Sequence, residues 1–314
     1  MTSPTIAQRT SLGIALGVSA YLIWGVLPLY LRPLSTHQPP LSTLLIISHR
    51  VVWSVALLAA LLTYMGMWGQ VLAAVRSRRT LGILAVSTAM VSINWTTFTY
   101  VATHGQVMQS ALGYFITPIV SALLGMVFLK ERLRPLQLAA LALAAFGVAY
   151  LGVMLGVVPH AALLLASSWG VYGLLRKIAP VEALAGLAVE TAILFLPALA
   201  YLLYAVAVDV PAARLSLPWL LYVAIGCGLF TTVPLLFFSK SARILRLSTV
   251  GFLQYIGPTC QFALAVLVFG ETFTRIHAVA FGLIWTAIAL FVIDALRHNY
   301  FTPRQSPPLP QEPT

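Results

Sequence analysis

The sequence has few charged residues. Asp, Glu, Lys and Arg make up 8% of its 314 residues, against roughly 25% in soluble globular domains, and hydrophobic residues make up 60%. This composition excludes a soluble globular protein and indicates an integral membrane protein. The 18 Lys and Arg residues outnumber the 7 Asp and Glu residues. They are dispersed between apolar runs, however, and do not form the basic patch that a nucleic-acid interface requires.

Cysteines are also few, and catalytic motifs are lacking. Cys227 and Cys260 both lie within apolar runs, where we expect them to pack as small residues and not to form a disulfide or a metal site. No G-x-x-x-x-G-K-[ST] loop and no H-E-x-x-H motif occurs. The sequence therefore predicts no enzyme activity, no cofactor and no metal site. A membrane-embedded enzyme and a structural or regulatory membrane protein remain as alternatives.

Long apolar runs fill most of the chain and predict an all-α, polytopic membrane protein of ten transmembrane helices. We expect the first run to be a retained helix, because it is too long for the core of a signal peptide. The expected segments are 11–31, 41–64, 80–100, 106–129, 135–155, 159–175, 183–208, 217–239, 247–269 and 275–296. Residues 1–10 would form a cytoplasmic N-terminus, and the proline-rich residues 298–314 a disordered cytoplasmic tail.

The distribution of Lys and Arg between the loops predicts the orientation. With ten segments, the two ends of the chain and the loops on their side of the membrane carry 14 of these residues. The loops on the opposite side carry 3, and Arg50 lies inside an apolar segment. Cytoplasmic loops carry the excess of positive charge. Both termini are therefore expected in the cytoplasm, with the protein in the cell inner membrane.

The two halves of the chain are similar to each other. The stretch "GYFITPIVSALLGMVFLKE" aligns with "FLQYIGPTCQFALAVLVFGE", so that Pro118 falls on Pro258 and Glu131 on Glu271, each pair 140 residues apart. We interpret residues 11–155 and 159–297 as two five-helix repeats. An odd number of helices inverts the second repeat in the membrane, and inverted repeats that meet at a midplane site are typical of secondary transporters.

Polar residues recur on one face of two repeat-related segments, which predicts the lining of a cavity, although packing between helices is an alternative for the Ser and Thr residues. The fourth segment presents Gln106, Ser110, Gly113, Tyr114, Thr117 and Ser121, and the ninth presents Gly251, Gln254, Pro258 and Gln261, with Tyr255 beside them. Kinks at Pro118, Pro234 and Pro258 could act as hinges, while simple helix bending is the alternative.

Aromatic and charged residues complete the candidate site. Tyr21 and Trp24 are repeat-equivalent to Trp169 and Tyr172, either as a cavity wall or as core. Asn94 needs a hydrogen-bond partner inside its segment. Arg50 and Glu190 are 140 residues apart, and we expect them to pair across the pseudo-two-fold axis, either beside the substrate path or as a structural ion pair. The predicted substrate-binding set is Tyr21, Trp24, Arg50, Asn94, Tyr114, Trp169, Tyr172, Glu190, Gln254 and Tyr255.

Several of these stretches resemble the drug/metabolite transporter superfamily, and specifically its EamA-domain permeases of the RarD type, often labelled chloramphenicol-sensitive protein. They include "SAYLIWGVLPLY", "HRVVWS", "HGQVMQSALGYFITP" and "LSTVGFLQYIGPT", and the resemblance extends over about residues 12 to 297. Lys130 departs from the pattern, because such proteins usually have glycine there. The resemblance implies an inner-membrane permease that exports metabolites or drugs.

Together these observations predict a secondary active or facilitative transporter that exports a small metabolite or amphipathic drug-like solute by alternating access. Its expected partners are a small-molecule substrate and the lipid bilayer. Small residues such as Ala140, Ala144 and Gly147 could support a homodimer, but packing within one chain explains them equally well.

Overall fold

Helices form the whole secondary structure of the described chain. The computed structural model describes residues 6–103, 107–156, 160–268, 270 and 273–301, and it contains no strand among them. The helices are α1 (Ile6–Gly25), α2 (Leu27–Thr36), α3 (Thr43–Met65), α4 (Trp68–Arg76), α5 (Arg78–Thr103), α6 (Val107–Leu129), α7 (Pro135–Leu155), α8 (His160–Ile178), α9 (Ala183–Ala207), α10 (Leu217–Ile244), α11 (Leu247–Leu253), α12 (Ile256–Leu267) and α13 (Arg275–Phe301). Gln106 and Glu271 lie outside the described residues.

Seven helical segments in the described ranges are long and apolar enough to cross a membrane. They are Gln8–Leu34, Thr43–Met65, Arg78–Val101, Pro135–Leu155, Ala183–Ala207, Leu217–Ile244 and Arg275–Asp294, and a shorter apolar helix covers Gly113–Leu129. This establishes a multi-pass, all-helical membrane protein. Each of the ten expected segments overlaps at least one described helix, but ten transmembrane passes remain a prediction.

Residues at the helix boundaries explain where several of these helices begin and end. The Ser42 hydroxyl accepts a hydrogen bond from the Leu45 amide at 3.3 Å and caps the start of α3. The same helix ends at Met65 and is capped by Gly66, whose φ of 64° lies in the left-handed region that glycine adopts without strain. The helix α4 was not expected, and α13 extends into the predicted tail as far as Phe301.

The ninth predicted segment is broken into α11 and α12. Proline has no N–H, so Pro258 cannot donate to the carbonyl of Gln254 four residues earlier. The Gly257 amide donates to that carbonyl instead, at 3.3 Å. The break places Gln254 and Tyr255 between two short helices, where a continuous helix was expected.

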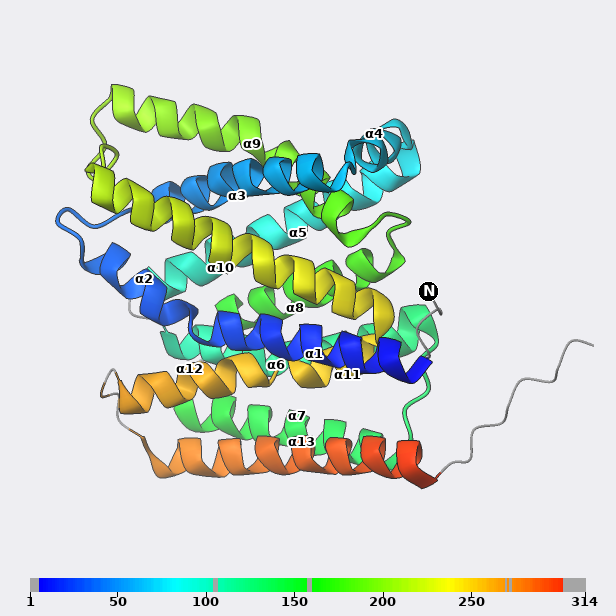
Figure 1. Cartoon of the computed structure of the whole chain (residues 1–314). Coiled ribbons are helices and arrows are strands. Elements are labelled where there is room, and N and C mark those ends of the chain that lie inside the picture. Colours follow the sequence, from blue (N-terminus) through cyan, green and yellow to red (C-terminus); the bar gives the residue numbers. More distant parts are fainter. Residues whose placement is uncertain (1–5, 104–106, 157–159, 269, 271–272, 302–314) are drawn as a thin grey trace, which may run out of the picture.

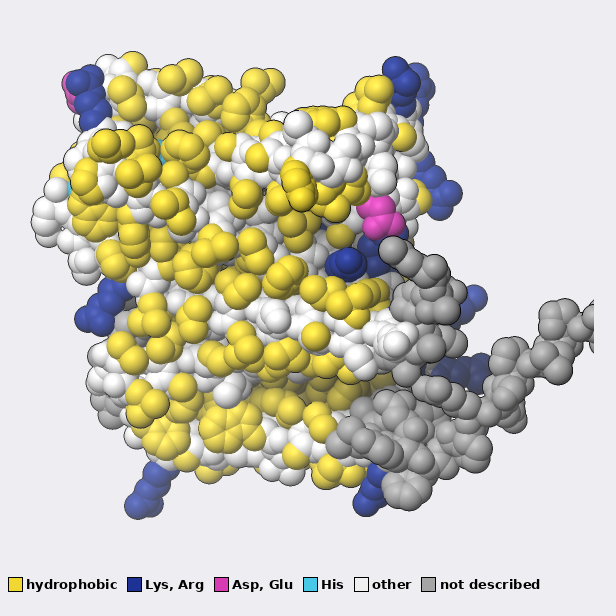
Figure 2. Space-filling view, in the orientation of Figure 1, with side chains coloured by type: hydrophobic (Ala, Val, Ile, Leu, Met, Phe, Trp, Pro, Cys, Tyr) yellow, Lys and Arg dark blue, Asp and Glu magenta, His cyan; other side chains and the backbone are white. Residues whose placement is uncertain are grey.

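The helices pack side by side with their long axes roughly parallel or antiparallel (Figure 1). α3 packs on α9 and α10, α1 on α10 and α12, α6 on α8 and α11, and α7 on α13 at one edge of the bundle. Figure 2 shows hydrophobic side chains spread over the face formed by α10, α1, α12 and α13, with Lys and Arg side chains at the two ends of the helices. This apolar surface suits contact with lipid.

Candidate functional site

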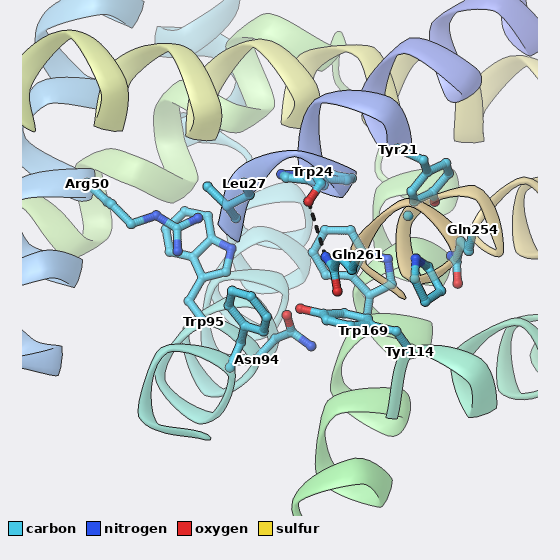
Figure 3. Close-up of a pocket in the computed structure, with 13 residues that line it drawn as sticks. Tyr21, Trp24, Leu27, Arg50, Asn94, Trp95, Tyr114, Trp169, Gln254 and Gln261 are labelled. Carbon is cyan, nitrogen blue, oxygen red and sulfur yellow. Dashed lines mark hydrogen bonds between the residues drawn. The ribbon is translucent and has the colours of Figure 1, made fainter. Parts of the chain in front are cut away.

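A pocket lies in the interior of the helix bundle, where segments from both halves of the chain meet (Figure 3). Counted together with its open mouth, its empty space is about 580 Å³. Its lining is Tyr21 and Trp24 from α1, Leu27 from α2, Arg50 from α3, Asn94, Trp95 and Phe98 from α5, Tyr114 from α6, Trp169 from α8, Gln254 from the break after α11, and Gly257, Pro258 and Gln261 from α12.

Aromatic rings form one wall of this pocket. The rings of Trp24 and Trp169 meet edge to face, with centroids 5.1 Å apart and an interplanar angle of 85°. The ring centroid of Tyr21 lies 5.6 Å from that of Trp24. Behind the wall, the ring centroid of Phe238 lies 5.0 Å from that of Trp169. Edge-to-face pairs of this kind are favourable beyond the area they bury. The wall therefore offers a rigid apolar surface to a bound molecule.

Two amides are held in place at the pocket by backbone carbonyls. The Gln261 side chain donates to the Trp24 carbonyl at 3.1 Å, a bond drawn in Figure 3. The Asn94 side chain donates to the Leu165 carbonyl at 3.0 Å and to the Ser168 hydroxyl at 3.3 Å. The hydrogen-bond partners that Asn94 requires are therefore on α8, the helix that also carries Trp169. The same hydrogen bonds connect α5 to α8.

Arg50 is the charged side chain of the pocket. It is 4% exposed, and its Nε donates to the Thr231 hydroxyl of α10 at 3.0 Å. The carbon of its guanidinium group lies 4.6 Å from the centroid of the Trp95 ring, within the range of a cation–π interaction. In Figure 3 the side chain reaches across the Trp95 ring at one end of the pocket.

The predicted pairing of Arg50 with Glu190 is wrong. Glu190 pairs with Arg176 of α8, whose Nη1 lies 3.4 Å from Oε1 of the carboxylate. The expected sixth segment, 159–175, left Arg176 in the following loop, but the residue lies inside α8 and is 1% exposed. Ser87 donates to the same carboxylate oxygen at 2.6 Å, and Tyr172 to the other at 3.5 Å.

Arg176 is held by further groups on its other nitrogens. Its Nη2 donates to the Ala183 carbonyl at 3.0 Å, and its Nε to the Ser239 hydroxyl at 3.2 Å. Gly186 leaves room for it, because a Cβ at that position would lie 2.4 Å from Nη1. The Arg176–Glu190 pair and these partners form a buried polar cluster separate from the residues that line the pocket.

The pocket brings together most of the residues that the sequence singled out. Tyr21, Trp24, Arg50, Asn94, Tyr114, Trp169 and Gln254 all line it. Tyr172 and Glu190 belong to the polar cluster instead. The ring of Tyr255 packs against those of Phe115 and Phe252, away from the pocket lining. A substrate-binding role for these residues remains a prediction.

The three proposed hinge prolines have different positions. Pro258 lines the pocket in the first turn of α12, whereas Pro118 and Pro234 lie inside α6 and α10. A hinge role stays a prediction for all three.

Sequence reasoning omitted several lining residues from the binding set. Trp95 and Phe98 stand one and four residues after Asn94, and the position of Phe98 on the same helical face was a usable signal. Gln261 had been placed on the polar face of the ninth segment. Leu27 and Gly257 carry no chemical signal that separates them from packing residues.

Comparison with known proteins gives consistent matches over nearly the whole chain. The profile of the EamA-like transporter family matches residues 11–153 and 159–293. An uncharacterized transporter of Vibrio cholerae is 43% identical over 295 residues, covering 93% of this chain and 96% of that protein. Protein RarD of Salmonella typhimurium is 42% identical, covering 92% of this chain and 97% of that protein.

More distant matches agree. A chloramphenicol-sensitive protein RarD of Pseudomonas aeruginosa is 30% identical, covering 91% of this chain and 95% of that protein. A crystal structure of a protein that is 22% identical superposes with a TM-score of 0.64, covering 91% of this chain and 98% of that chain. That likeness shows a shared fold. The two profile matches and the RarD relatives establish that the chain belongs to the EamA-like transporter family.

Proposed function

We propose that this protein is a secondary transporter that exports a small metabolite or amphipathic drug-like solute across the cell inner membrane. The solute binds in the central pocket, and access alternates between the two sides of the membrane. The energy comes from a solute or ion gradient, or transport is facilitative. Relatives named as transporters in Vibrio cholerae, Pseudomonas aeruginosa and Bacillus subtilis support transport over the alternatives, a membrane enzyme or a structural protein.

The observation that carries this proposal is the composition of the pocket. Residues of the first half, such as Trp24 and Asn94, and residues of the second half, such as Trp169 and Gln254, line one space. A binding site between two repeats can open to one side and then to the other when the repeats move relative to each other.

The packing of the helices supports two inverted repeats. Three pairs of equivalent helices begin 140 residues apart: α3 at Thr43 and α9 at Ala183, α6 at Val107 and α11 at Leu247, and α7 at Pro135 and α13 at Arg275. Each of these equivalent helices packs on its counterpart. The pair α1 and α10 has an equivalent in α8 and α5, which also pack together. Contacts of this kind are expected from a pseudo-two-fold axis between the halves.

Ten membrane passes with both termini in the cytoplasm complete the proposal. The broken segment α11–α12 and the helix α8 would cross inside the bundle, where neighbouring helices and not lipid satisfy their polar groups. The excess of Lys and Arg in alternate loops supports the orientation. The protein acts as a monomer or as a homodimer.

Filling the pocket tests the function. A Cβ on Gly257 would meet only the Tyr21 carbonyl, at 3.7 Å, so Gly257→Leu adds a side chain at the pocket without a backbone clash. A matched control is Gly282→Leu, because Gly282 lies on an exposed face of α13 with nothing within 4 Å of an added Cβ.

The culture media of cells that express equal amounts of each protein in the membrane are compared by untargeted metabolite analysis. Wild-type and Gly282→Leu cells should release the same few additional compounds, and Gly257→Leu cells should release less of them. Equal release by all three variants contradicts transport through this pocket. Accumulation of the same compounds inside wild-type cells contradicts export but does not contradict transport through this pocket.

A further inference from the structure

Two arginines are buried in the part of the chain that the structure describes, and their surroundings differ. Arg176 and Arg50 are 1% and 4% exposed. Arg176 faces the carboxylate of Glu190, with a hydroxyl and a backbone carbonyl on its other nitrogens. Arg50 faces the Trp95 ring and donates its Nε to the neutral Thr231 hydroxyl. A buried charge is tolerated when it is paired, and a ring and a hydroxyl supply no countercharge.

The described carboxylates do not supply the missing countercharge. None of them lies within 4.0 Å of Arg50, and each has another arginine as its partner. The pairs are Glu131 with Arg246, Glu182 with Arg243, Glu190 with Arg176, Asp209 with Arg214 and Asp294 with Arg134. The lining of the pocket holds the positive charge of Arg50 and no acidic residue.

We propose that the transported solute supplies this countercharge: it is an organic monoanion whose carboxylate binds Arg50 and whose apolar, flat part lies against the aromatic wall of the pocket. The inference rests on the proposed function and names the substrate class of the same site. One fixed cation matches one negative charge, so a dianion would leave one charge buried without a partner.

The geometry at Arg50 favours a planar acid group. A guanidinium carries five N–H donors in a rigid fork, and Nε uses one of them on Thr231. That bond and the Trp95 ring on one face of the group fix the plane in which the two terminal nitrogens lie. A carboxylate can accept two parallel hydrogen bonds from such a fork, which a lysine cannot offer.

The other end of the pocket suits the remainder of the molecule. Trp24 and Trp169 form an apolar wall there, and the amides of Asn94 and Gln261 are already bonded to backbone carbonyls. An apolar or aromatic group with at most a few polar substituents is therefore favoured at this end. An ammonium group at the Arg50 end would be repelled.

Matched ligands test the charge preference on the purified full-length protein in detergent. We would measure binding of 3-phenylpropionate, 3-phenylpropanamide and 3-phenylpropylamine, and of the same three end groups on an indole, by quenching of tryptophan fluorescence and by the shift in melting temperature. The ligands within each set differ only in the end group. The carboxylates should bind wild-type protein roughly ten- to a hundredfold more tightly than the amides, the scale of a charge-assisted hydrogen bond, and the amines should bind least.

Variants at Arg50 test whether this residue causes the preference for carboxylates over amides. Arg50→Gln should bring carboxylate and amide to equal affinity, and Arg50→Lys should keep part of the preference, because it keeps the charge and loses the fork. Arg214→Gln is the matched control, since it removes an arginine that is 68% exposed and outside the pocket, and it should leave all affinities unchanged. If Arg50→Gln does not fold, the wild-type series and Arg50→Lys still give the preference.

Three outcomes overturn the inference: equal binding of carboxylates and amides to the wild-type protein, no binding of any carboxylate, or an unchanged preference in Arg50→Gln. The proposed function is judged separately, by release of 3-phenylpropionate, 3-phenylpropanamide or 3-phenylpropylamine, each preloaded into proteoliposomes and compared with protein-free liposomes. Binding with the expected preference but without release contradicts transport and keeps the anion site. Release of neutral or cationic solutes alone supports transport and overturns the anion site.

Discussion

Removing the negative charge of Glu190 should destabilise the protein strongly. Glu190→Gln keeps the size of the side chain and leaves the guanidinium of Arg176 buried without a countercharge. Arg176 is 1% exposed and Glu190 2% exposed, so water cannot replace the lost carboxylate unless the side chains around the pair move apart. The hydroxyl of Ser87, 2.6 Å from Oε1, can still bond to the glutamine oxygen.

The expected loss follows from the environment of the pair. Breaking a buried ion pair by removing one partner costs about 3 to 5 kcal/mol. We expect the lower half of that range, because the Nη1–Oε1 distance of 3.4 Å is long and Arg176 keeps its bonds to Ser239 and Ala183. At about 2 to 4 °C for each kcal/mol, a loss of about 3 to 4 kcal/mol should lower the melting temperature by roughly 6 to 16 °C.

Thermal unfolding of the purified protein in a mild detergent, followed by tryptophan fluorescence, measures this effect. The matched control is Glu182→Gln, because Glu182 pairs with Arg243 at 3.1 Å but is 60% exposed. Exposed pairs contribute at most about 1 kcal/mol, so this variant should melt within a few degrees of wild type. If Glu190→Gln melts as Glu182→Gln does, Arg176 and Glu190 are not the buried ion pair that the structure shows.

Three further substitutions, the first with a matched control, test backbone positions and a helix cap. Gly186→Ala should lower the melting temperature, because its Cβ would lie 2.4 Å from Nη1 of Arg176, whereas Gly152→Ala, with nothing within 4 Å, should leave it unchanged or raise it in the same assay. Lys130→Gly should raise stability by about 1 kcal/mol, since Lys130 has a φ of 54° and left-handed backbone strains residues with a Cβ; an unchanged or lower melting temperature would contradict this. Glu131→Gln should lower it by a few degrees, about 1 kcal/mol, because the carboxylate accepts hydrogen bonds from the two backbone amides that begin α11, at 2.7 and 3.1 Å; an unchanged melting temperature would show that the cap contributes nothing.

Most of the helices could be located from the sequence, because runs of apolar residues bounded by charged or proline-containing turns set their ends. The start of α7 at Pro135 and the start of α9 at Ala183 agree with the expected segments. The helix α4 was missed because its nine residues are too few to show as a separate apolar run. The break after α11 was also missed, since the carbonyl that Pro258 leaves without its amide partner was expected to kink one continuous helix and not to divide it in two.

The position of Lys130 shows how a departure from a family pattern can be read physically. A glycine is usual there in proteins of the RarD type, and the left-handed φ of 54° is the conformation that glycine adopts without strain. The sequence showed the departure, but only the backbone shows that it bears on stability.

The lining of the pocket was predicted better than the partner of Arg50. Tyr21, Trp24 and Trp169 were found because aromatic residues deep inside apolar segments recurred at equivalent places in the two halves. The proposed partner of Arg50 was wrong because equivalent residues need not touch. Arg50 and Glu190 each stand seven residues after the first residue of α3 and of α9, and these helices run in opposite directions (Figure 1).

The antiparallel packing of α3 and α9 separates the two residues. Positions near the starts of antiparallel helices lie toward opposite ends of the pair. Arg50 donates to Thr231 of α10, and Arg176, the partner of Glu190, donates to Ser239 of the same helix, eight residues or roughly 12 Å further along at 1.5 Å per residue. Aligning the two halves of the chain at a fixed spacing identifies equivalent residues. Two equivalent residues are in contact only if they also lie close to the pseudo-two-fold axis. Arg176 was passed over as a partner because a basic residue before "KIAP" looks like part of a cytoplasmic turn.

The helix α8 links the pocket to the buried ion pair. Trp169 forms part of the pocket wall, and Tyr172 and Arg176 follow on the next two turns of the same helix. The ring of Tyr172 lies 5.2 Å from that of Trp169, and its hydroxyl donates to Glu190 of α9. Under alternating access, the path from the pocket toward this end of the bundle can open in two ways. Either α8 and α9 move together as one body, or the Arg176–Glu190 pair separates in a low dielectric. Separation would leave both charges unpaired, so joint movement of the two helices is the favoured route.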